Sequence, residues 1–228
     1  MTDEIISRNL AAVRGEIEDA ERAAGREGKT TMLVATKYAD GEMLAALMRA
    51  GVREVGENRV QQLLEHYAEY ERAGARVHFI GSLQTNKVKY IVDKVAMIHS
   101  IDSLRLAAEV EKQAAKKDRV IEVLVEINAA REASKTGVMP EEAEALCREI
   151  LKMPHLKLCG FMTMGSVLES NEAYRAYFEG VRTFGEALWK QLALAGDPVF
   201  SMGMSQSFVP AILAGADIVR IGRRLFAE

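Results

Sequence analysis

Cysteine is scarce in this sequence: among 228 residues, only Cys147 and Cys159 are cysteines. They stand alone, without a Cys-x-x-Cys pair and without the spacing of metal ligands. Both lie in apolar contexts, which is typical of reduced packing residues in a cytosolic protein. The shortage therefore argues against a disulfide scaffold, a cysteine metal site and a redox function.

Long apolar runs and an excess of one charge are also missing. No run approaches the ~20 apolar residues of a membrane span, and the N-terminus is acidic and amphipathic, unlike a signal peptide. Thirty Lys and Arg stand against thirty-three Asp and Glu, for a net charge of −3. This balance gives no electrostatic reason to expect nucleic acid or an anionic membrane as a partner. We predict a cytoplasmic protein that binds neither.

The sequence does contain a regular alternation of short apolar runs and amphipathic stretches, without a low-complexity linker. Eight runs predict strands, at 32–36, 52–56, 77–81, 96–101, 120–128, 156–164, 199–203 and 217–222. After an amphipathic N-terminal helix, helices are expected at 41–50, 58–72, 86–93, 103–117, 140–152, 171–194 and 206–214. Strands that alternate with helices pair in parallel through right-handed crossovers. Eight such units predict an α/β fold, a single (β/α)8 TIM barrel with an N-terminal helix, in one domain over residues 1–228, because such a barrel takes ~250 residues.

Lys37 stands where the first apolar run stops. Met32, Leu33, Val34 and Ala35 are uncharged, as expected of a strand that is buried on both faces. Lys37 would then lie at the carboxyl end of this strand, the end at which parallel α/β folds bind ligands. A solvated lysine that closes a strand would give the same pattern, so the position indicates a site more strongly than the residue type does.

In a barrel, all the strand ends open at one mouth. The candidate residues collected there are Lys37, Asn58, His78 or Gly81 with Ser82, Asn128, Met162, Ser201 to Ser205, and Arg220 with Gly222.

The loops after the seventh and eighth strands favour a phosphate site. Ser205 can cap the following helix, whose free N–H groups could hold a phosphate, although an ordinary capped helix would look the same. The segment "RIGRR" follows one unit later, and a phosphate held by these two loops is a recurrent barrel feature. Gly222 would let the backbone approach the ligand closely. Arg223 and Arg224 could add charge or could be solvated.

Arg220 lies within the last predicted strand. Alternation along "DIVRIG" places Ile218, Arg220 and Gly222 on one face and Val219 with Ile221 on the other. A guanidinium on the ligand side of a strand needs an acceptor. Either a neighbouring carboxylate or a ring nitrogen of a bound cofactor could supply it.

Eight motifs follow one another across nearly the whole chain: "ATKY", "VREVGENRVQQ", "HFIGSLQTNK", "SIDS", "SKTGV", "GFMTM", "SMGMS" and "VRIG". Together they closely resemble the YggS/PROSC family of pyridoxal phosphate homeostasis proteins, which is similar in fold to the barrel domain of alanine racemase (fold type III). The resemblance implies that Lys37 forms the internal aldimine with pyridoxal 5'-phosphate (PLP). It implies a cofactor site made of Lys37, Asn58, Met162, Ser201, Ser205, Arg220, Gly222 and Arg223.

The resemblance also implies a role for most of these residues. Ser205, Gly222 and the backbone of residue 223 would hold the phosphate, with Ser201 close by. Asn58 would line the cofactor, and Arg220 would meet the pyridine nitrogen.

Three positions depart from the family pattern. Ser82 stands where proline is usual, Gln206 and Ser207 replace acidic residues, and Arg223 replaces a usual threonine. An arginine could replace the threonine hydroxyl by its charge or could turn to solvent.

The predicted site favours a cofactor carrier over a catalyst. An imine forms only from a neutral amine, so we expect burial and the nearby charge of Arg220 to lower the pKa of Lys37 from ~10.4. Arginine cannot accept a proton and would leave the pyridine nitrogen neutral, which weakens carbanion chemistry. The resembling racemases take a second acid from an added β domain and a partner subunit, whereas this chain stops at Glu228. We therefore expect a monomer that holds PLP without strong turnover and passes it to PLP-dependent apoenzymes.

Two other functions remain open. An amino-acid racemase of the same fold would need a second acid at the mouth, for which Tyr38 and Tyr67 are candidates. A Schiff-base aldolase would use Lys37 on a sugar carbonyl and would need a carboxylate base, for which Glu57 or Glu126 could serve. A carrier should be yellow when purified, and an aldolase colourless.

Overall fold

The eight predicted strands form a closed parallel barrel in the computed structural model, which describes residues 2–132, 135–165 and 167–227. The strands are β1 (Thr31–Ala35), β2 (Glu54–Glu57), β3 (Arg76–Phe79), β4 (Met97–Ile101), β5 (Ile121–Glu126), β6 (Leu156–Met162), β7 (Val199–Met204) and β8 (Ile218–Ile221). Each strand pairs with the next, and β8 pairs with β1, where Leu33 lies level with Arg220. The barrel prediction is confirmed. Ser134 of the "SKTGV" motif and Glu228 lie outside the described residues.

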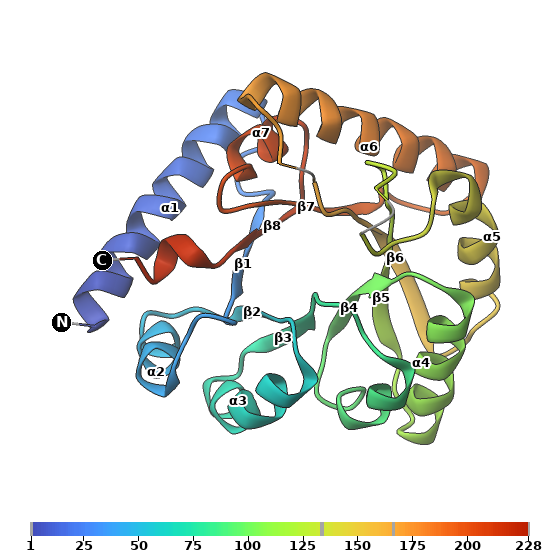
Figure 1. The fold of residues 1–228 in the computed structure, drawn as a ribbon, viewed down its shortest axis with the longest axis horizontal. Coiled ribbons are helices and arrows are strands. Elements are labelled where there is room, and N and C mark those ends of the chain that lie inside the picture. The colour runs from blue at the N-terminus through green and yellow to red at the C-terminus, as the bar shows by residue number, and fades with distance from the viewer. Residues whose placement is uncertain (1, 133–134, 166, 228) are drawn as a thin grey trace.

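Helices surround the barrel, as Figure 1 shows. They are α1 (Thr2–Ala24), α2 (Gly41–Arg49), α3 (Val60–Ala73), η1 (Thr85–Tyr90), α4 (Leu104–Lys116), α5 (Pro140–Ile150), α6 (Asn171–Gln191), α7 (Phe208–Leu213) and η2 (Arg223–Leu225). Two expectations are corrected: the helix expected at 86–93 is the shorter 3-10 helix η1, and the one expected at 206–214 begins at Phe208. Among the described residues, no helix combines the length and the apolar character needed to cross a membrane.

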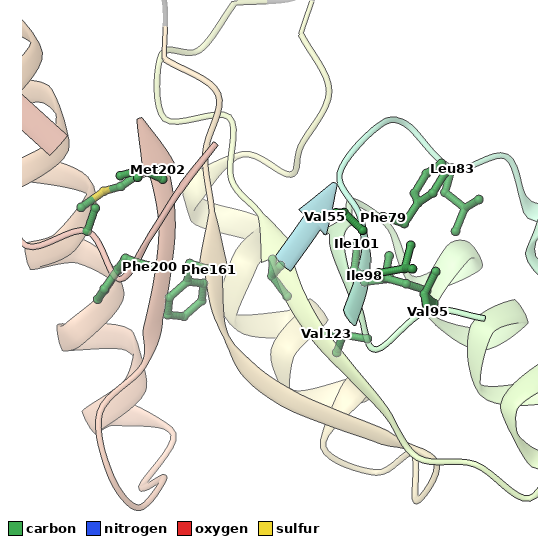
Figure 2. Close-up of a cluster of buried hydrophobic side chains, with 14 of the residues drawn as sticks. Val55, Phe79, Leu83, Val95, Ile98, Ile101, Val123, Phe161, Phe200 and Met202 are labelled. Atoms are coloured by element: carbon green, nitrogen blue, oxygen red, sulfur yellow. The ribbon is translucent and has the colours of Figure 1, made fainter. Parts of the chain in front are cut away.

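Side-chain alternation along the strands divides the core into two layers. One face of each strand packs against the helices, where Phe79, Ile98, Val123, Phe161 and Phe200 belong to one buried cluster (Figure 2). The other face points into the barrel, whose smaller apolar cluster contains Leu33, Ala35, Ile80, Met97, Leu124, Met162 and Ile218. The two layers follow from the period of two in a β-strand. A polar residue in phase with the inner cluster is therefore enclosed by the barrel.

The first helix joins the two ends of the chain. The apolar stripe of α1, which includes Ile6 and Leu10, is buried, and α1 runs beside α7 and the C-terminal segment in Figure 1. Asn9 Nδ2 donates to the carbonyl oxygen of Ala227 at 2.8 Å, and Arg224 pairs with Glu16. These contacts hold the loop after β8 in place.

Candidate functional site

Lys37 lies in the turn directly after β1, at the predicted strand end. Its Nζ is 5.0 Å from the centroid of the Tyr38 ring, and the Arg223 guanidinium carbon is 5.9 Å from the same centroid. Hydrogen bonding from Arg223, together with the positive charge of Lys37, lowers the pKa of the Tyr38 phenol. The loops after β1 and β8 therefore meet around Tyr38. The expected burial of Lys37 is wrong, because its side chain is exposed.

A buried polar cluster supports this turn from the outer side of the barrel. The Tyr70 hydroxyl, on α3, lies 2.9 Å from Thr36 Oγ1 and 2.5 Å from Glu57 Oε1. His66 Nδ1 is 2.9 Å from the same carboxylate oxygen. Burial, with the charge of Glu57, raises the pKa of Tyr70, so its phenol stays protonated. Glu57, proposed above as an aldolase base, is thus engaged with α3. We call Thr36, Glu57, His66 and Tyr70 the outer cluster.

Arg220 is buried inside the barrel, as its place in the strand alternation predicts. One terminal nitrogen donates to the carbonyl oxygen of Ser201 at 2.7 Å and to Ser201 Oγ at 2.8 Å. The other donates to the carbonyl oxygen of Thr163 at 2.9 Å. Burial lowers the pKa of Arg220 to about 10, against the opposing charge of Glu126, so it remains a cation at neutral pH. These bonds use three of its five N–H groups.

A line of hydrogen-bonded side chains continues from Ser201 through the barrel. Ser201 Oγ is 2.9 Å from His99 Nδ1, and His99 Nε2 is 2.8 Å from His78 Nδ1. His78 Nε2 is 2.7 Å from Glu54 Oε2. Glu54 begins β2, so the line reaches the N-terminal mouth. Of the two alternatives predicted at the end of the third strand, His78 is wrong, and Gly81 with Ser82 are the residues that follow β3. We call Glu54, His78, His99, Ser201 and Arg220 the inner chain.

Ser205 and Gly222 bring the loops after β7 and β8 together. The Gly222 N–H donates to Ser205 Oγ at 3.2 Å. A Cβ at Gly222 would lie 3.2 Å from the carbonyl oxygen of Ala35, so glycine permits this close approach. The helix-cap role predicted for Ser205 is wrong, because α7 begins at Phe208 and Ser207 is the residue that precedes it.

Asn58 follows β2 and carries an unused acceptor. Its Oδ1 is buried and has no hydrogen-bond partner among the described residues. A buried polar atom without a partner is costly, and a ligand with a donor group would relieve that cost. Gly81 packs so tightly behind Asn58 that a Cβ there would lie 2.2 Å from the Asn58 carbonyl oxygen.

Three other predicted mouth residues have different roles. Asn128 Nδ2 donates to the carbonyl oxygen of Glu132 at 2.8 Å and so shapes the loop after β5. Glu126 is buried, and its Oε1 accepts from Thr136 Oγ1 at 2.5 Å. Burial raises the pKa of Glu126. Ser82 is exposed.

Sequence reasoning missed Glu54, His99 and Thr163. A signal for the first two was present, because each is in phase with the inward-facing positions of its strand. Thr163 contributes its backbone carbonyl. Every residue type has this group, so the sequence carries no sign of the contact.

Cavities open at the other end of the barrel. One of ≈ 490 Å³ is lined by Glu54, Arg76, His78, Glu122 and Lys157, among others. Another, of ≈ 500 Å³, lies between α1 and the starts of β1 and β2. Lys37 lines neither of them. The candidate site is therefore defined by its side-chain chemistry and by the convergence of three loops.

Comparison with known proteins gives one consistent result. Residues 9–228 match the family model for the alanine racemase N-terminal domain. A pyridoxal phosphate homeostasis protein of Aquifex aeolicus is 41% identical over 220 residues, which cover 96% of each chain. A protein of the same name from Pseudomonas aeruginosa is 35% identical and covers 97% of this chain and 94% of its own.

Solved structures agree with these matches. PipY of Synechococcus elongatus PCC7942, determined with PLP bound, superposes with a TM-score of 0.85 at 25% identity and covers 97% of this chain and 100% of its own. Alanine racemase of Clostridium difficile has a TM-score of 0.73 at 16% identity; it covers 99% of this chain, which spans 57% of its length, and shows a shared fold. The chain therefore belongs to the alanine racemase N-terminal domain family and, within it, to the pyridoxal phosphate homeostasis proteins.

Proposed function

We propose that the protein binds PLP at the C-terminal mouth of the barrel and holds it for homeostasis of the cofactor. The observation that carries this proposal is the meeting of the loops after β1, β7 and β8. Ser205 Oγ accepts from the Gly222 N–H, and Arg223 and Lys37 both lie over the Tyr38 ring. The names of the curated relatives and the PLP-bound PipY structure support the choice of cofactor.

The residues at this mouth fit PLP. The cofactor has three groups that a site must accommodate. They are a phosphate, a ring nitrogen and an aldehyde, which reacts with an amine. Lys37 offers the amine, and its exposed Nζ can reach an incoming aldehyde. Asn58 Oδ1, which is buried and unpartnered among the described residues, offers an acceptor to the phenolic side of the ring.

The remaining predicted residues divide between the phosphate and the ring. We assign the phosphate to Ser205, Gly222 and the backbone N–H of Arg223. The exposed Arg223 side chain, held over Tyr38, adds positive charge near it. Arg220 and Ser201 are assigned to the ring nitrogen, and Met162, which is buried in the barrel interior, to the floor beneath the ring.

Arg220 also accounts for a protein that holds PLP without strong turnover. When bound, PLP supplies an aldehyde and an electron-withdrawing ring, and the ring withdraws strongly only when its nitrogen is protonated. Arginine has no acceptor and cannot stabilise that proton. Its position is fixed by Ser201 and Thr163, so it offers a donor in a constant place.

Several finer expectations belong to the same proposal. We infer that Lys37 is linked to PLP as a Schiff base, and that the protein is a cytoplasmic monomer formed by one domain over residues 1–228. PLP-dependent apoenzymes are the proposed recipients. Oligomeric state can be measured by sedimentation, and transfer can be measured by activation of a PLP-dependent apoenzyme across a dialysis membrane and in direct mixture.

The test is chemical trapping of the cofactor. Lys37→Ala should abolish the yellow absorbance and the covalent label left by borohydride reduction, while the fold persists because Lys37 is exposed. Lys89→Ala is the matched control, since Lys89 Nζ also lies over its neighbouring ring, 4.9 Å from the centroid of Tyr90. Peptide mapping that finds the label at Lys89 or Lys135, with Lys37 unmodified, would overturn the proposal.

A further inference from the structure

The inner chain crosses the barrel from one mouth to the other. Its members come from five strands: Glu54 from β2, His78 from β3, His99 from β4, Ser201 from β7 and Arg220 from β8. Their links measure 2.7, 2.8, 2.9 and 2.8 Å in that order. Apolar residues such as Leu33, Met97 and Leu124 make up the rest of the interior. The chain is therefore an enclosed polar path through an apolar layer.

One direction of donation satisfies every hydrogen bond of the inner chain. Arg220 can only donate, so Ser201 Oγ accepts from it. The hydroxyl hydrogen of Ser201 is then available for an unprotonated His99 Nδ1. In this arrangement a neutral His99 carries its hydrogen on Nε2 and donates it to His78 Nδ1. His78 in turn donates from Nε2 to the Glu54 carboxylate.

The inner chain has a charged group at each end, Glu54 and Arg220. Although burial acts against it, the hydrogen bond from His78 and the charge of Arg76 help to lower the pKa of Glu54, which stays a carboxylate. Burial lowers the pKa of His99, and the charge of Arg220 acts in the same sense, so His99 is neutral. The direct contact of the two imidazoles at 2.8 Å leaves no room for a metal ion between them.

We propose that His99 and His78 are positioning residues for the cofactor site, which hold the Ser201 hydroxyl and thereby Arg220 in one orientation. Glu54 anchors this arrangement at the opposite mouth of the barrel. Two imidazoles enclosed in an apolar layer are unfavourable unless their hydrogen bonds are made. The inner chain makes each of these bonds and ends at Arg220, the cation assigned above to the ring nitrogen of PLP. The consequence for PLP rests on the function proposed above, whereas the direction of the chain does not.

The direction of the hydrogen bonds in the inner chain can be measured in the full chain without added cofactor. The protein has four histidines, and ¹⁵N NMR distinguishes a protonated from an unprotonated ring nitrogen. His99 should be neutral with its hydrogen on Nε2, and His78 should carry a hydrogen on the Nε2 that faces Glu54. His155 is the internal control, because its Nδ1 faces Glu111 Oε1 at 2.8 Å and should carry a hydrogen. A hydrogen on Nδ1 of His99 overturns the proposal, whatever the cofactor does.

Paired variants test the consequence for the cofactor. His99→Gln keeps one acceptor and one donor, whereas His99→Leu removes both and leaves Ser201 Oγ without its acceptor. Loss of one hydrogen bond in a network that ends on a charged group changes a binding equilibrium about tenfold. We expect PLP to leave His99→Leu about tenfold faster on dialysis, while His99→Gln and the remote control His155→Gln stay within about twofold of the parent.

The outcomes separate the two proposals. If folded His99→Leu and the parent release PLP at the same rate, His99 does not position the cofactor site. If His99→Leu does not fold, His78→Gln and His78→Leu allow the same comparison at the next residue of the inner chain. Equal rates of PLP release from those two variants would also contradict the proposal. If borohydride leaves Lys37 unlabelled in the parent, the proposed function fails, while the ¹⁵N result still decides the direction of the chain.

Discussion

The inner chain and the outer cluster both satisfy buried polar side chains with hydrogen bonds, but they do so with different arrangements. Both bury polar side chains behind the proposed cofactor site, and both end beside a residue assigned to PLP. The inner chain ends at Arg220 and has opposite charges at its two ends. The outer cluster ends at Thr36, next to Lys37, and its Glu57 Oε2 is buried with no hydrogen-bond partner among the described residues.

The difference follows from the space that each group occupies. Inside the barrel, side chains from different strands meet in layers, so polar groups can be joined only along a narrow path. Between β2 and α3, a long side chain such as Tyr70 can reach two partners at once. The inner chain therefore fixes the orientation of a side chain, whereas the outer cluster fixes the backbone turn that carries Lys37.

The largest effect is expected from breaking the inner chain at its charged end. Arg220→Met would remove the donors to Ser201 and Thr163 and the charge that opposes the raised pKa of Glu126. Removing one member of a buried charged network costs about 3–5 kcal/mol of unfolding free energy. Urea unfolding measures it. Arg223→Met, at an exposed position, should change stability by less than about 0.5 kcal/mol; similar losses in both variants would contradict the network.

A smaller effect is expected from the outer cluster. Tyr70→Phe keeps the buried ring but removes the hydroxyl that lies 2.5 Å from Glu57 Oε1. The carboxylate then loses a close partner, and a loss of about 1–3 kcal/mol is expected. Tyr67→Phe, on the same helix, is the control and should leave the unfolding midpoint nearly unchanged. If Tyr70→Phe unfolds at the same urea concentration as the parent, the hydroxyl contributes nothing to holding the turn at Lys37.

The smallest effect is a difference in pH dependence. The pKa of His99 lies well below its ordinary 6.5 because of burial, with the charge of Arg220 acting in the same sense. The unfolded chain therefore takes up a proton near pH 6.5 that the folded protein refuses, so stability is present above this pH and is lost below it. Relative to His99→Gln, the parent should lose about 1 kcal/mol over roughly one pH unit below 6.5. Parallel unfolding curves of the two proteins across this window would exclude a neutral buried His99.

The sequence predicts the strands well because their pattern is local. Each apolar run became a strand, and the alternation of "DIVRIG" placed Arg220 correctly inside the barrel. Helix ends were harder to predict, since serine can precede a helix at several positions. Ser205 is a suitable cap by residue type, yet Ser207 precedes α7, and Ser205 Oγ accepts from the Gly222 N–H instead.

Long-range polar contacts were the part that could not be predicted. The contact of His99 with Ser201 joins residues 102 positions apart. Strand alternation predicts only that His99 and Ser201 both point into the barrel. Their level along the barrel axis depends on the register of every strand pair between them, including the shifts in β4–β5 and β7–β8. The level of His78 along the barrel axis depends on strand register in the same way.

The sequence by itself determined the closed order of eight strands and the face on which each strand residue lies, because the period of two and the alternation with helices act over a few residues at a time. Only the tertiary structure decided that Lys37 is exposed beside Tyr38, and that Arg220 is tied through two histidines to Glu54 at the far mouth. Those relations arise when the sheet closes, since closure sets the tilt and stagger that bring distant strands to the same level.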